Sequence, residues 1–295
     1  MFHDIRTVQT ARITRFGSGA VVVRNNGGLD EAALRSAAPT VFAEDKHSSR
    51  SDKYTYIPTV EVLRGLGREG FLPVEVRVGG TRDEEKRGYT KHLLRLRRMG
   101  DAPTRVGDSS RELVLLNSHD GTSSYQLMSG LFRLICSNGL VCADGDAQIL
   151  KIPHKGDIVQ QVIDGAYRIV DASEEVDRIA AEMKQIELRP AEQDAFAEAA
   201  AELRWNGEGQ RVPVEPRQIH APRRREDVGN SLWLAFNRTQ EGLIRGGIDY
   251  QQRNPETGRL IARRQTRPVQ GVDGNTALNR ALWVLANRMA ELKAA

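Results

Sequence analysis

Hydrophobic positions along the chain predict a block of strands followed by a block of helices. Apolar residues alternate with polar ones, or form short runs, in six segments that we expect to be strands: 21–24, 72–78, 90–98, 112–117, 123–129 and 148–152. One helix interrupts this block, beginning at Thr59 and ending at Gly70. Its apolar side is predicted to carry Val62, Leu63 and Leu66.

After residue 152 the apolar period lengthens to that of helices. Helices are predicted at 157–187, 191–203 and 226–245, with a final helix capped by Asp273 or Asn275. The segment 254–271 reads as irregular or as a basic hairpin. The pattern therefore indicates an α+β protein: a small, mostly antiparallel sheet with a β-β-β-α type core, long helices packed on it, and a helical C-terminal region.

Changes in composition suggest four regions. We expect a weakly patterned segment at 1–53, an α+β core domain with long acidic helices at 54–204, a Pro/Arg-rich linker at 205–225, and a helical, Arg-rich region at 226–295.

The strand at 90–98 is predicted to have two unlike faces. One face carries His92, Leu94 and Leu96, and the other carries Lys91, Arg95 and Arg97 together with Leu93. We therefore expect one side to pack on the core and the other to present positive charge to solvent.

Two turn signals lie close together in NSHDGTSSYQLMSGLFRLICSNG. Asp120-Gly121 is a strong turn former, and Asn138-Gly139 suits a two-residue hairpin turn. Such a hairpin would set Cys136 opposite Val141 and Ile135 opposite Cys142, so the two thiols would point to opposite faces. We therefore predict neither a disulfide nor a metal site between them.

Composition is that of a globular protein of 295 residues, with 39% hydrophobic and 28% charged residues. No apolar run approaches the ~20 residues needed to span a bilayer, and the charged start MFHDIRTVQTARITRF lacks the apolar segment of a signal peptide. We expect a cytoplasmic protein without a membrane partner.

Charge is distributed unevenly although the net charge is only +4. Residues 157–204 hold twelve acids against five bases, whereas residues 211–270 hold twelve arginines against six acids. This asymmetry suggests either an anionic partner or neutralisation of the arginines by the acidic helices.

Cationic side chains are the candidate nucleic-acid contacts, because guanidinium groups bind phosphate in a bidentate manner. They form three clusters: Lys91, Arg95, Arg97 and Arg98; Arg223, Arg224 and Arg225; and Arg263, Arg264 and Arg267. Aromatic side chains that could stack on bases are few: Tyr89, Tyr125, Phe132 and Tyr250.

His119, Asp120 and Cys136 have the residue types of a thiol hydrolase, which needs a base within reach of the thiol. Cys136, however, lies in the apolar run LFRLIC, where a free cysteine is usually a small buried hydrophobe. No phosphate-binding loop is present in the sequence. We expect no enzymatic turnover, no metal and no cofactor, with a His/Asp/Cys-dependent hydrolase or nuclease as an alternative.

Four blocks carry a resemblance to a known family: NSHDGTSSYQLMSGLFRLICSNGL, YTYIPTVEVLRGLGREGF, KHLLRLRR and LWLAFNRTQEGLIRGG. The chain resembles, from about Tyr54 to Leu292, the phage- and plasmid-borne family called domain of unknown function 932. The resemblance implies a mobile-element setting and transfers no catalytic residue. The matched positions that deserve scrutiny are His92, Asn117, His119, Asp120, Arg133, Cys136, Asn138 and His154.

The predicted order of elements is also similar to the core of single-strand annealing proteins of the Rad52 and Redβ type. We therefore expect a nucleic-acid-binding protein that acts on single-stranded DNA in recombination or replication. A homo-oligomer is compatible with this expectation. An inhibitor of host defence or restriction, acting by protein contact, is the alternative from another class.

Overall fold

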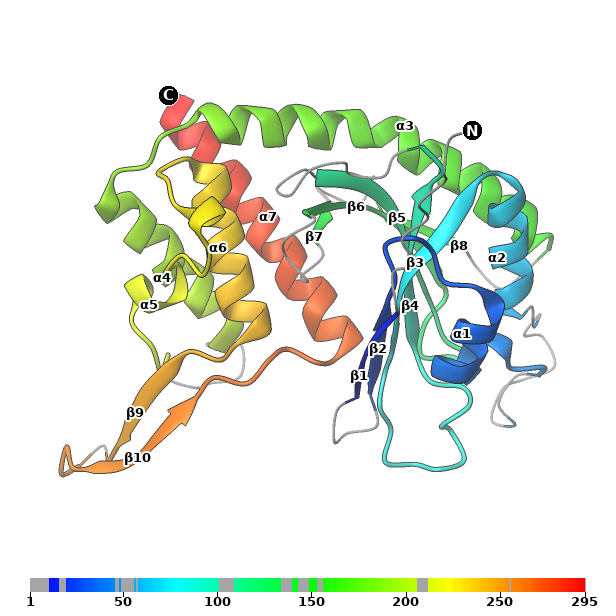
Figure 1. Ribbon diagram of the computed structural model, residues 1–295, viewed down its shortest axis with the longest axis horizontal. Helices are drawn as coiled ribbons and strands as arrows, with labels where there is room; N and C mark the ends of the chain where they lie inside the picture. The colour runs from blue at the N-terminus through cyan, green and yellow to red at the C-terminus, as the bar shows by residue number, and fades with distance from the viewer. Residues whose placement is uncertain are drawn as a thin grey trace, which may run out of the picture.

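An eight-stranded antiparallel sheet lies at the centre of one half of the computed structural model (Figure 1). Its strands are β1 (Arg12–Arg15), β2 (Val21–Arg24), β3 (Phe71–Val78), β4 (His92–Arg98), β5 (Ser109–Asn117), β6 (Tyr125–Arg133), β7 (Leu140–Cys142) and β8 (Ile149–Ile152). They follow the order β1-β2-β3-β4-β5-β6-β7, and β8 pairs with β6. The predicted α+β class with an antiparallel sheet is confirmed, and the sheet has more strands than a β-β-β core.

The structure describes residues 11–15, 20–45, 48, 56, 58–100, 109–133, 140–142, 149–152, 156–205, 212–254 and 256–294. For residues 109–110, 131–133, 140–142 and 172–174 only the backbone is described. Cys136, Asn138 and His154, with the turn predicted at 138–139, lie outside the described residues. The side chain of Arg133 is likewise outside the described part of the structure.

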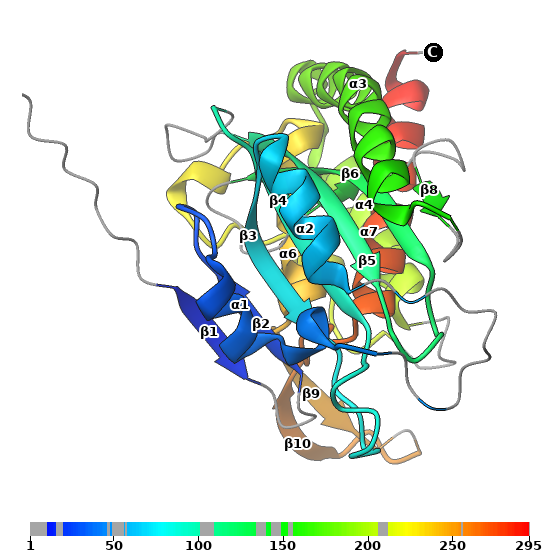
Figure 2. The same ribbon diagram turned by 90° about the vertical axis from the view of Figure 1, so that its right-hand side faces the viewer.

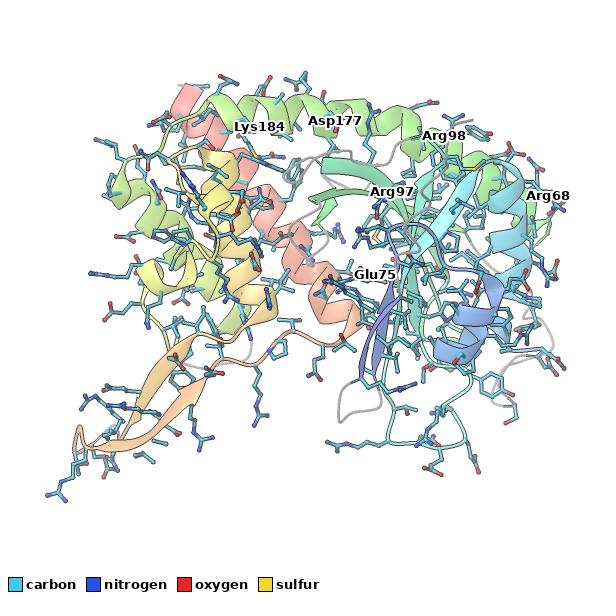
Figure 3. All side chains as sticks on the ribbon, viewed as in Figure 1. Arg68, Glu75, Arg97, Arg98, Asp177 and Lys184 are labelled. Carbon is cyan, nitrogen blue, oxygen red and sulfur yellow. The ribbon has the colours of Figure 1, made fainter. Side chains whose placement is uncertain are left out.

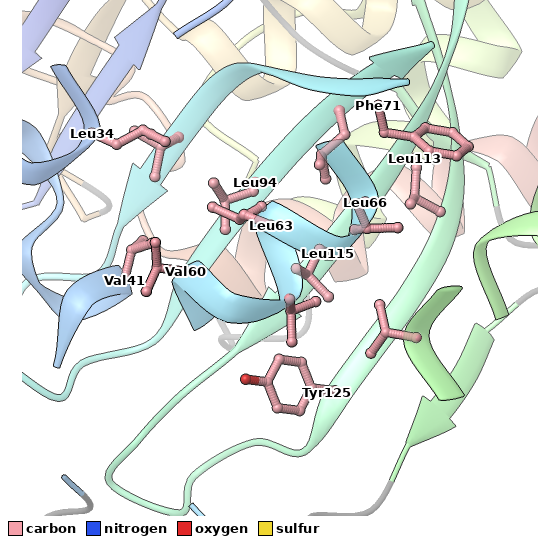
Figure 4. Packing of buried hydrophobic residues seen from close by; sticks show 14 of the residues in the cluster. Leu34, Val41, Val60, Leu63, Leu66, Phe71, Leu94, Leu113, Leu115 and Tyr125 are labelled. Atoms are coloured by element: carbon pink, nitrogen blue, oxygen red, sulfur yellow. The ribbon is translucent and has the colours of Figure 1, made fainter. Parts of the chain in front are cut away.

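Helices cover one face of this sheet and enclose the first hydrophobic core. They are α1 (Glu31–Ala37), the 3-10 turn η1 (Pro39–Phe42), α2 (Thr59–Arg68) and the first half of α3 (Ile158–Gln185). Figure 4 shows Leu63 and Leu66 of α2 packed with Leu94 and Leu115 of the sheet. Gly70 follows α2 at φ +84°, a conformation that glycine adopts readily and that lets the chain turn into β3.

A second hydrophobic core is built mainly from helices. It joins the second half of α3 to α4 (Pro190–Trp205), α5 (Pro216–Ile219), α6 (Leu232–Arg245) and α7 (Val272–Ala294), with the 3-10 turn η4 (Arg225–Asp227) beside them. The two cores separate within α3, because Ile169 belongs to the first and Val176 to the second. Figure 1 shows α3 running across both halves of the molecule. The division into domains at residues 204 and 225 stays a prediction.

A two-stranded antiparallel hairpin projects from the second half (Figures 1 and 2). It consists of β9 (Asp249–Arg253) and β10 (Leu260–Gln265), and we call residues 249–265 the arm. Gly247 N donates to Thr266 O at 2.8 Å, and Thr266 N donates to Ile248 O at 2.9 Å, so the ladder continues to the base of the arm. Of the two alternatives for residues 254–271, irregular or a basic hairpin, the structure shows a hairpin, which begins five residues earlier, at Asp249, and ends at Gln265.

The pairing of β6 with β7 differs from the predicted two-residue hairpin. Leu131 lies opposite Leu140, and Ser129 lies opposite Cys142, whereas the prediction placed Ile135 opposite Cys142. The observed register is shifted by six residues along the first strand. A shift by an even number leaves every side chain on the same face, so alternation alone could not distinguish the two registers.

Two helix starts and one additional short helix also differ from the sequence prediction. Helix α6 begins at Leu232 and not at Glu226, because Ser231 caps it by accepting a hydrogen bond from Leu234 N at 3.3 Å. Asp273 and Asn275 lie inside α7. The short helix α5 lies within the segment predicted as linker.

Among the described residues, no helix combines the length and the apolar character that crossing a membrane requires.

Candidate nucleic-acid interface

The arginines of β4 are buried in an ion-pair network. Arg95 is 8% exposed and Arg97 is 6% exposed, and their carboxylate partners Glu75 and Glu112 are 1% and 5% exposed. Arg95 donates from Nη1 to Glu75 and from Nε to Glu112, both at 2.6 Å. Arg97 Nη2 donates to Glu112 Oε1, also at 2.6 Å. The prediction that this strand presents a cationic face to solvent is wrong.

Strand register explains how the network assembles. Arg24 of β2 lies opposite Glu75 of β3, which lies opposite Arg95 of β4, and opposite residues share a face of the sheet. Other residues of this face pack against Val272 at the start of α7, and Figure 3 shows Glu75 and Arg97 between the strands and α7 in that view. The sequence pattern identified the face but not the second layer that covers part of it.

Electrostatics within the network favour the charged form of Glu75. Burial alone would raise the pKa of Glu75, but the guanidinium groups of Arg77, Arg95 and Arg24 outweigh burial and hold this pKa well below its ordinary value. Arg77 Nε lies 2.5 Å from Glu75 Oε1. With four arginines and two glutamates, the network carries a formal charge of +2. Loss of either carboxylate would leave like charges facing one another.

Other predicted cations are also used within the protein. Lys91 is paired with Asp273 of α7 at 2.7 Å. Arg223 Nη2 donates to the carbonyl of Gly246 at the base of the arm at 2.7 Å, and Arg224 is paired with Asp227 at 2.8 Å. These three side chains hold structural elements together.

Arg98 and Arg225 are exposed at the ends of their elements. Three acids of the long helices pair with nearby arginines and not with the arginine clusters: Arg178 pairs with Glu175 and Glu182, and Arg189 pairs with Glu192. These acids therefore have partners of their own.

The arm and its base carry the third predicted cluster, and here the arginines are exposed. Exposed arginines in residues 249–267 are Arg253, Arg259, Arg263, Arg264 and Arg267. Within the described part of the chain, none of the last four forms an ion pair with a carboxylate. The same segment contains only two acids, Asp249 and Glu256, so its formal charge is +3. The structure thus gathers unmatched positive charge on a projecting ribbon.

The tip and the faces of the arm are well defined by hydrogen bonds. Asn254 Oδ1 accepts from Glu256 N and Thr257 N, each at 2.9 Å, which fixes the turn. Arg253 donates to Gly258 O at 3.0 Å. Arg263 lies opposite Gln251 on one face, and its neighbour in sequence points to the other. Both faces of the ribbon therefore offer a guanidinium group.

A separate buried polar cluster unites the residues of the family blocks. The hydroxyl of Thr59, the first residue of α2, lies 2.9 Å from His92 Nε2 and 3.1 Å from His119 Nε2, and Asn117 Nδ2 donates to it at 3.1 Å. His92, Asn117 and His119 are each 0% exposed. The Tyr56 ring lies edge-on to His119, with 5.0 Å between centroids. Three of the scrutinised family positions thus meet at one hydroxyl.

The proton positions in this cluster follow from counting donors and acceptors. Thr40 Oγ1 donates to Thr90 O at 2.8 Å, so it can only accept from His92 Nδ1 at 3.2 Å, and Thr90 O is itself an acceptor. His92 therefore carries its proton on Nδ1, and its Nε2 accepts the hydroxyl proton of Thr59. Thr59 then accepts from Asn117 and from His119 Nε2. Burial lowers the pKa of His92 to about 4, which keeps the ring neutral.

This geometry does not support a catalytic role for His119 or Asp120. His119 is enclosed and bonded to a threonine hydroxyl. Asp120 accepts from Thr122 N at 3.0 Å and from Thr122 Oγ1 at 2.6 Å, which is the hydrogen-bond pattern of the predicted turn. The hydrogen bonds of the cluster connect α2, β4 and the end of β5. The third catalytic candidate, Cys136, lies outside the described residues.

Sequence reasoning missed the partners that give these residues their surroundings. Glu75 interrupts an apolar strand, and a carboxylate at such a position signals a buried cation, whereas Glu112 only precedes the apolar run 113–116. Thr59 was predicted only as a helix start. Its role arises because three segments that are distant in sequence come together in the fold, and a single sequence carries no local signal for such contacts.

Comparison with known proteins places the chain in a family. The model of the family described as Domain of unknown function (DUF932) matches residues 46–283. Two proteins of Escherichia coli (strain K12), UPF0380 protein YfjQ and UPF0380 protein YafZ, are each 45% identical over 280 residues, which is 95% of this chain and 98% of theirs. No solved structure matches the chain significantly, and the comparisons do not show the resemblance to single-strand annealing proteins. Since the family model covers most of the chain, including the buried polar cluster and the arm, the chain belongs to the DUF932 family.

Proposed function

We propose that this protein binds nucleic acid through the arm. The observation that carries the proposal is the set of exposed arginines at residues 253–267 that have no carboxylate partner on the ribbon. Arg263 and Arg264 lie on opposite faces of β10, and both are exposed. Several positive charges on a hairpin whose side chains are mostly exposed suit the binding of a polyanion.

Anchoring of the arm supports this role, because contacts made by an ordered element cost less entropy on binding. Thr266 Oγ1 accepts from Ile248 N at 3.1 Å, and Gln218 Nε2 donates to Asp249 O at 3.0 Å. Gly246 has φ +66°, and a Cβ there would lie 2.6 Å from Thr266 O. The base of the arm is thus tightly packed on the helical core.

The β4 cluster is left out of the proposal. Arg95 and Arg97 are held by Glu75 and Glu112, so exposing them to phosphate would leave carboxylates buried without partners. The mobile-element setting rests on the resemblance to a phage- and plasmid-borne family and is a further part of the proposal.

Fluorescence anisotropy with a labelled oligonucleotide at low salt tests the proposal. The double variant Arg263→Gln/Arg264→Gln is expected to weaken binding by about tenfold or more. The matched control, Arg68→Gln/Arg168→Gln, removes two exposed arginines from α2 and α3 and is expected to change affinity by less than about threefold. Absence of binding by the wild type, or an equal loss in both double variants, would overturn the proposal.

A further inference from the structure

We propose that the arm enters the minor groove of duplex DNA and that Leu260 and Ile261 insert against the base pairs there. This inference rests on the proposed function and specifies its ligand. It follows from the shape of the arm, from two exposed aliphatic side chains, and from the lack of an exposed aromatic side chain on the arm.

The shape of the arm suits a groove. Both strands expose most of their residues: the two central members of β9, Gln251 and Gln252, are exposed, as are Arg263, Arg264 and Gln265 in β10. A two-stranded ribbon of five or six residues extends roughly 17–20 Å, which is comparable with half a turn of a duplex. Strands with two solvent-facing sides have no core to build, so both faces are available for contact. The minor groove of straight B-DNA is only about 6 Å wide, so the ribbon enters it where a bend toward the major groove opens it.

Exposed aliphatic residues on the arm need a partner. Leu260 is 48% exposed and Ile261 is 57% exposed. The strand pairing is irregular between Leu260 and Ala262, which makes Ile261 the extra residue of a β-bulge. Bulges redirect side chains and are common next to functional sites. Two adjacent aliphatic groups beside arginines match the pattern of minor-groove proteins, in which apolar wedges separate base steps and the surrounding cations contact the backbone.

Hydrogen-bonding groups on the arm match the same groove. The minor groove presents adenine N3 and thymine O2 as acceptors, and arginine and glutamine supply donors. Narrow A·T-rich minor grooves also concentrate negative potential that attracts arginine. Arg263 and Gln251 lie opposite each other on one face, and Arg264 lies on the other face beside Gln252 and Ala262. Donors are therefore spread along the ribbon.

A single strand is a poorer match than a duplex. Proteins that bind single strands without sequence preference stack bases on aromatic side chains. The only aromatic residue between positions 249 and 267 is Tyr250, which is half-buried and packs against the helical core. The duplex proposal therefore departs from the single-strand expectation drawn from the sequence.

Anisotropy with a duplex and with each of its single strands tests the ligand. We expect at least about tenfold tighter binding to the duplex than to either strand at equal salt, and competition by netropsin, a small minor-groove ligand. If the protein binds neither form, the proposed function fails. If it binds single strands equally well or more tightly, or if netropsin does not compete, the proposed function stands and the groove inference is overturned.

Bending of an end-labelled duplex, measured by fluorescence energy transfer, tests the insertion. Leu260→Ser/Ile261→Ser is expected to abolish the bend while the arginines retain measurable binding. The control Leu203→Ser/Leu292→Ser removes exposed aliphatic groups from α4 and α7, which are 46% and 74% exposed, and should leave the bend unchanged. A wild-type complex without a bend, or a bend that persists in Leu260→Ser/Ile261→Ser, would overturn the insertion. Thermal unfolding of both variants checks that the fold is intact.

Discussion

Thr59 Oγ1 lies 2.9 Å from Nε2 of His92 and joins the first residue of α2 to the first residue of β4. Because the hydroxyl donates to His92 and accepts from two other side chains, it uses all of its hydrogen-bonding capacity. The side chains involved are buried, so water cannot replace a lost partner. This single contact therefore helps to set the position of α2 on the sheet.

Replacing Thr59 by valine removes the hydroxyl but keeps the shape of the side chain. Three buried polar groups would lose a partner, so we expect the free energy of unfolding to fall by about 2–4 kcal/mol. Urea unfolding followed by circular dichroism measures this change. Thr59→Ser keeps the hydroxyl and should cost less than about 1.5 kcal/mol; equal losses in the two variants would argue against the hydrogen-bond network.

Stability should decline as the pH falls from 6.5 toward 4. In the folded protein the pKa of His92 is about 4 because of its burial, whereas its ordinary value is 6.5. The unfolded chain therefore binds more protons in this interval, and His92 alone contributes a loss of about 3 kcal/mol across it. Glu75, whose pKa is lowered, loses its contribution only below its ordinary value of 4.5.

Urea titrations at pH 7, 6 and 5 isolate the histidine contribution, since Glu75 acts only at lower pH. His92→Gln lacks the titrating ring and should show a flatter dependence of unfolding free energy on pH over this range, whatever its absolute stability. A dependence as steep as that of the wild type would contradict the assignment to His92.

Removing the carboxylate of Glu75 should be among the most damaging single changes. Glu75→Gln leaves Arg24, Arg77 and Arg95 close together without their shared counter-charge, so we expect a loss of about 3–5 kcal/mol. Glu61→Gln is the control, since this glutamate forms an exposed ion pair with Arg64 at 2.8 Å and should cost less than about 1 kcal/mol. Comparable midpoints of urea unfolding for the two variants would show that the buried network is not stabilising.

Much of the fold could be predicted because its local signals agree. The apolar run at 112–117 predicted a central strand, and β5 lies between β4 and β6. Asp157 was expected to begin a long helix, and it caps α3 by accepting from Gln160 N at 3.0 Å. In each case residue propensity and hydrophobic pattern point to the same element.

The candidate site was harder to predict because burial depends on contacts between distant segments. Arg95 and Arg263 look alike in the sequence, as arginines in short, basic strands. The first is enclosed by Glu75 and Glu112, whereas the second lies on an arm with no layer over it. Only the three-dimensional arrangement separates an arginine that stabilises the sheet from one that can reach a ligand.

Salt dependence of DNA binding tests the central claim most directly, because each phosphate contact releases counterions. The slope of log K against log salt should be steep for the wild type and shallower by about two for Arg263→Gln/Arg264→Gln, if each arginine accounts for about 0.9 of the slope. Arg68→Gln/Arg168→Gln should keep the wild-type slope. Identical slopes for the wild type and the arm variant would contradict the claim that the arm binds nucleic acid.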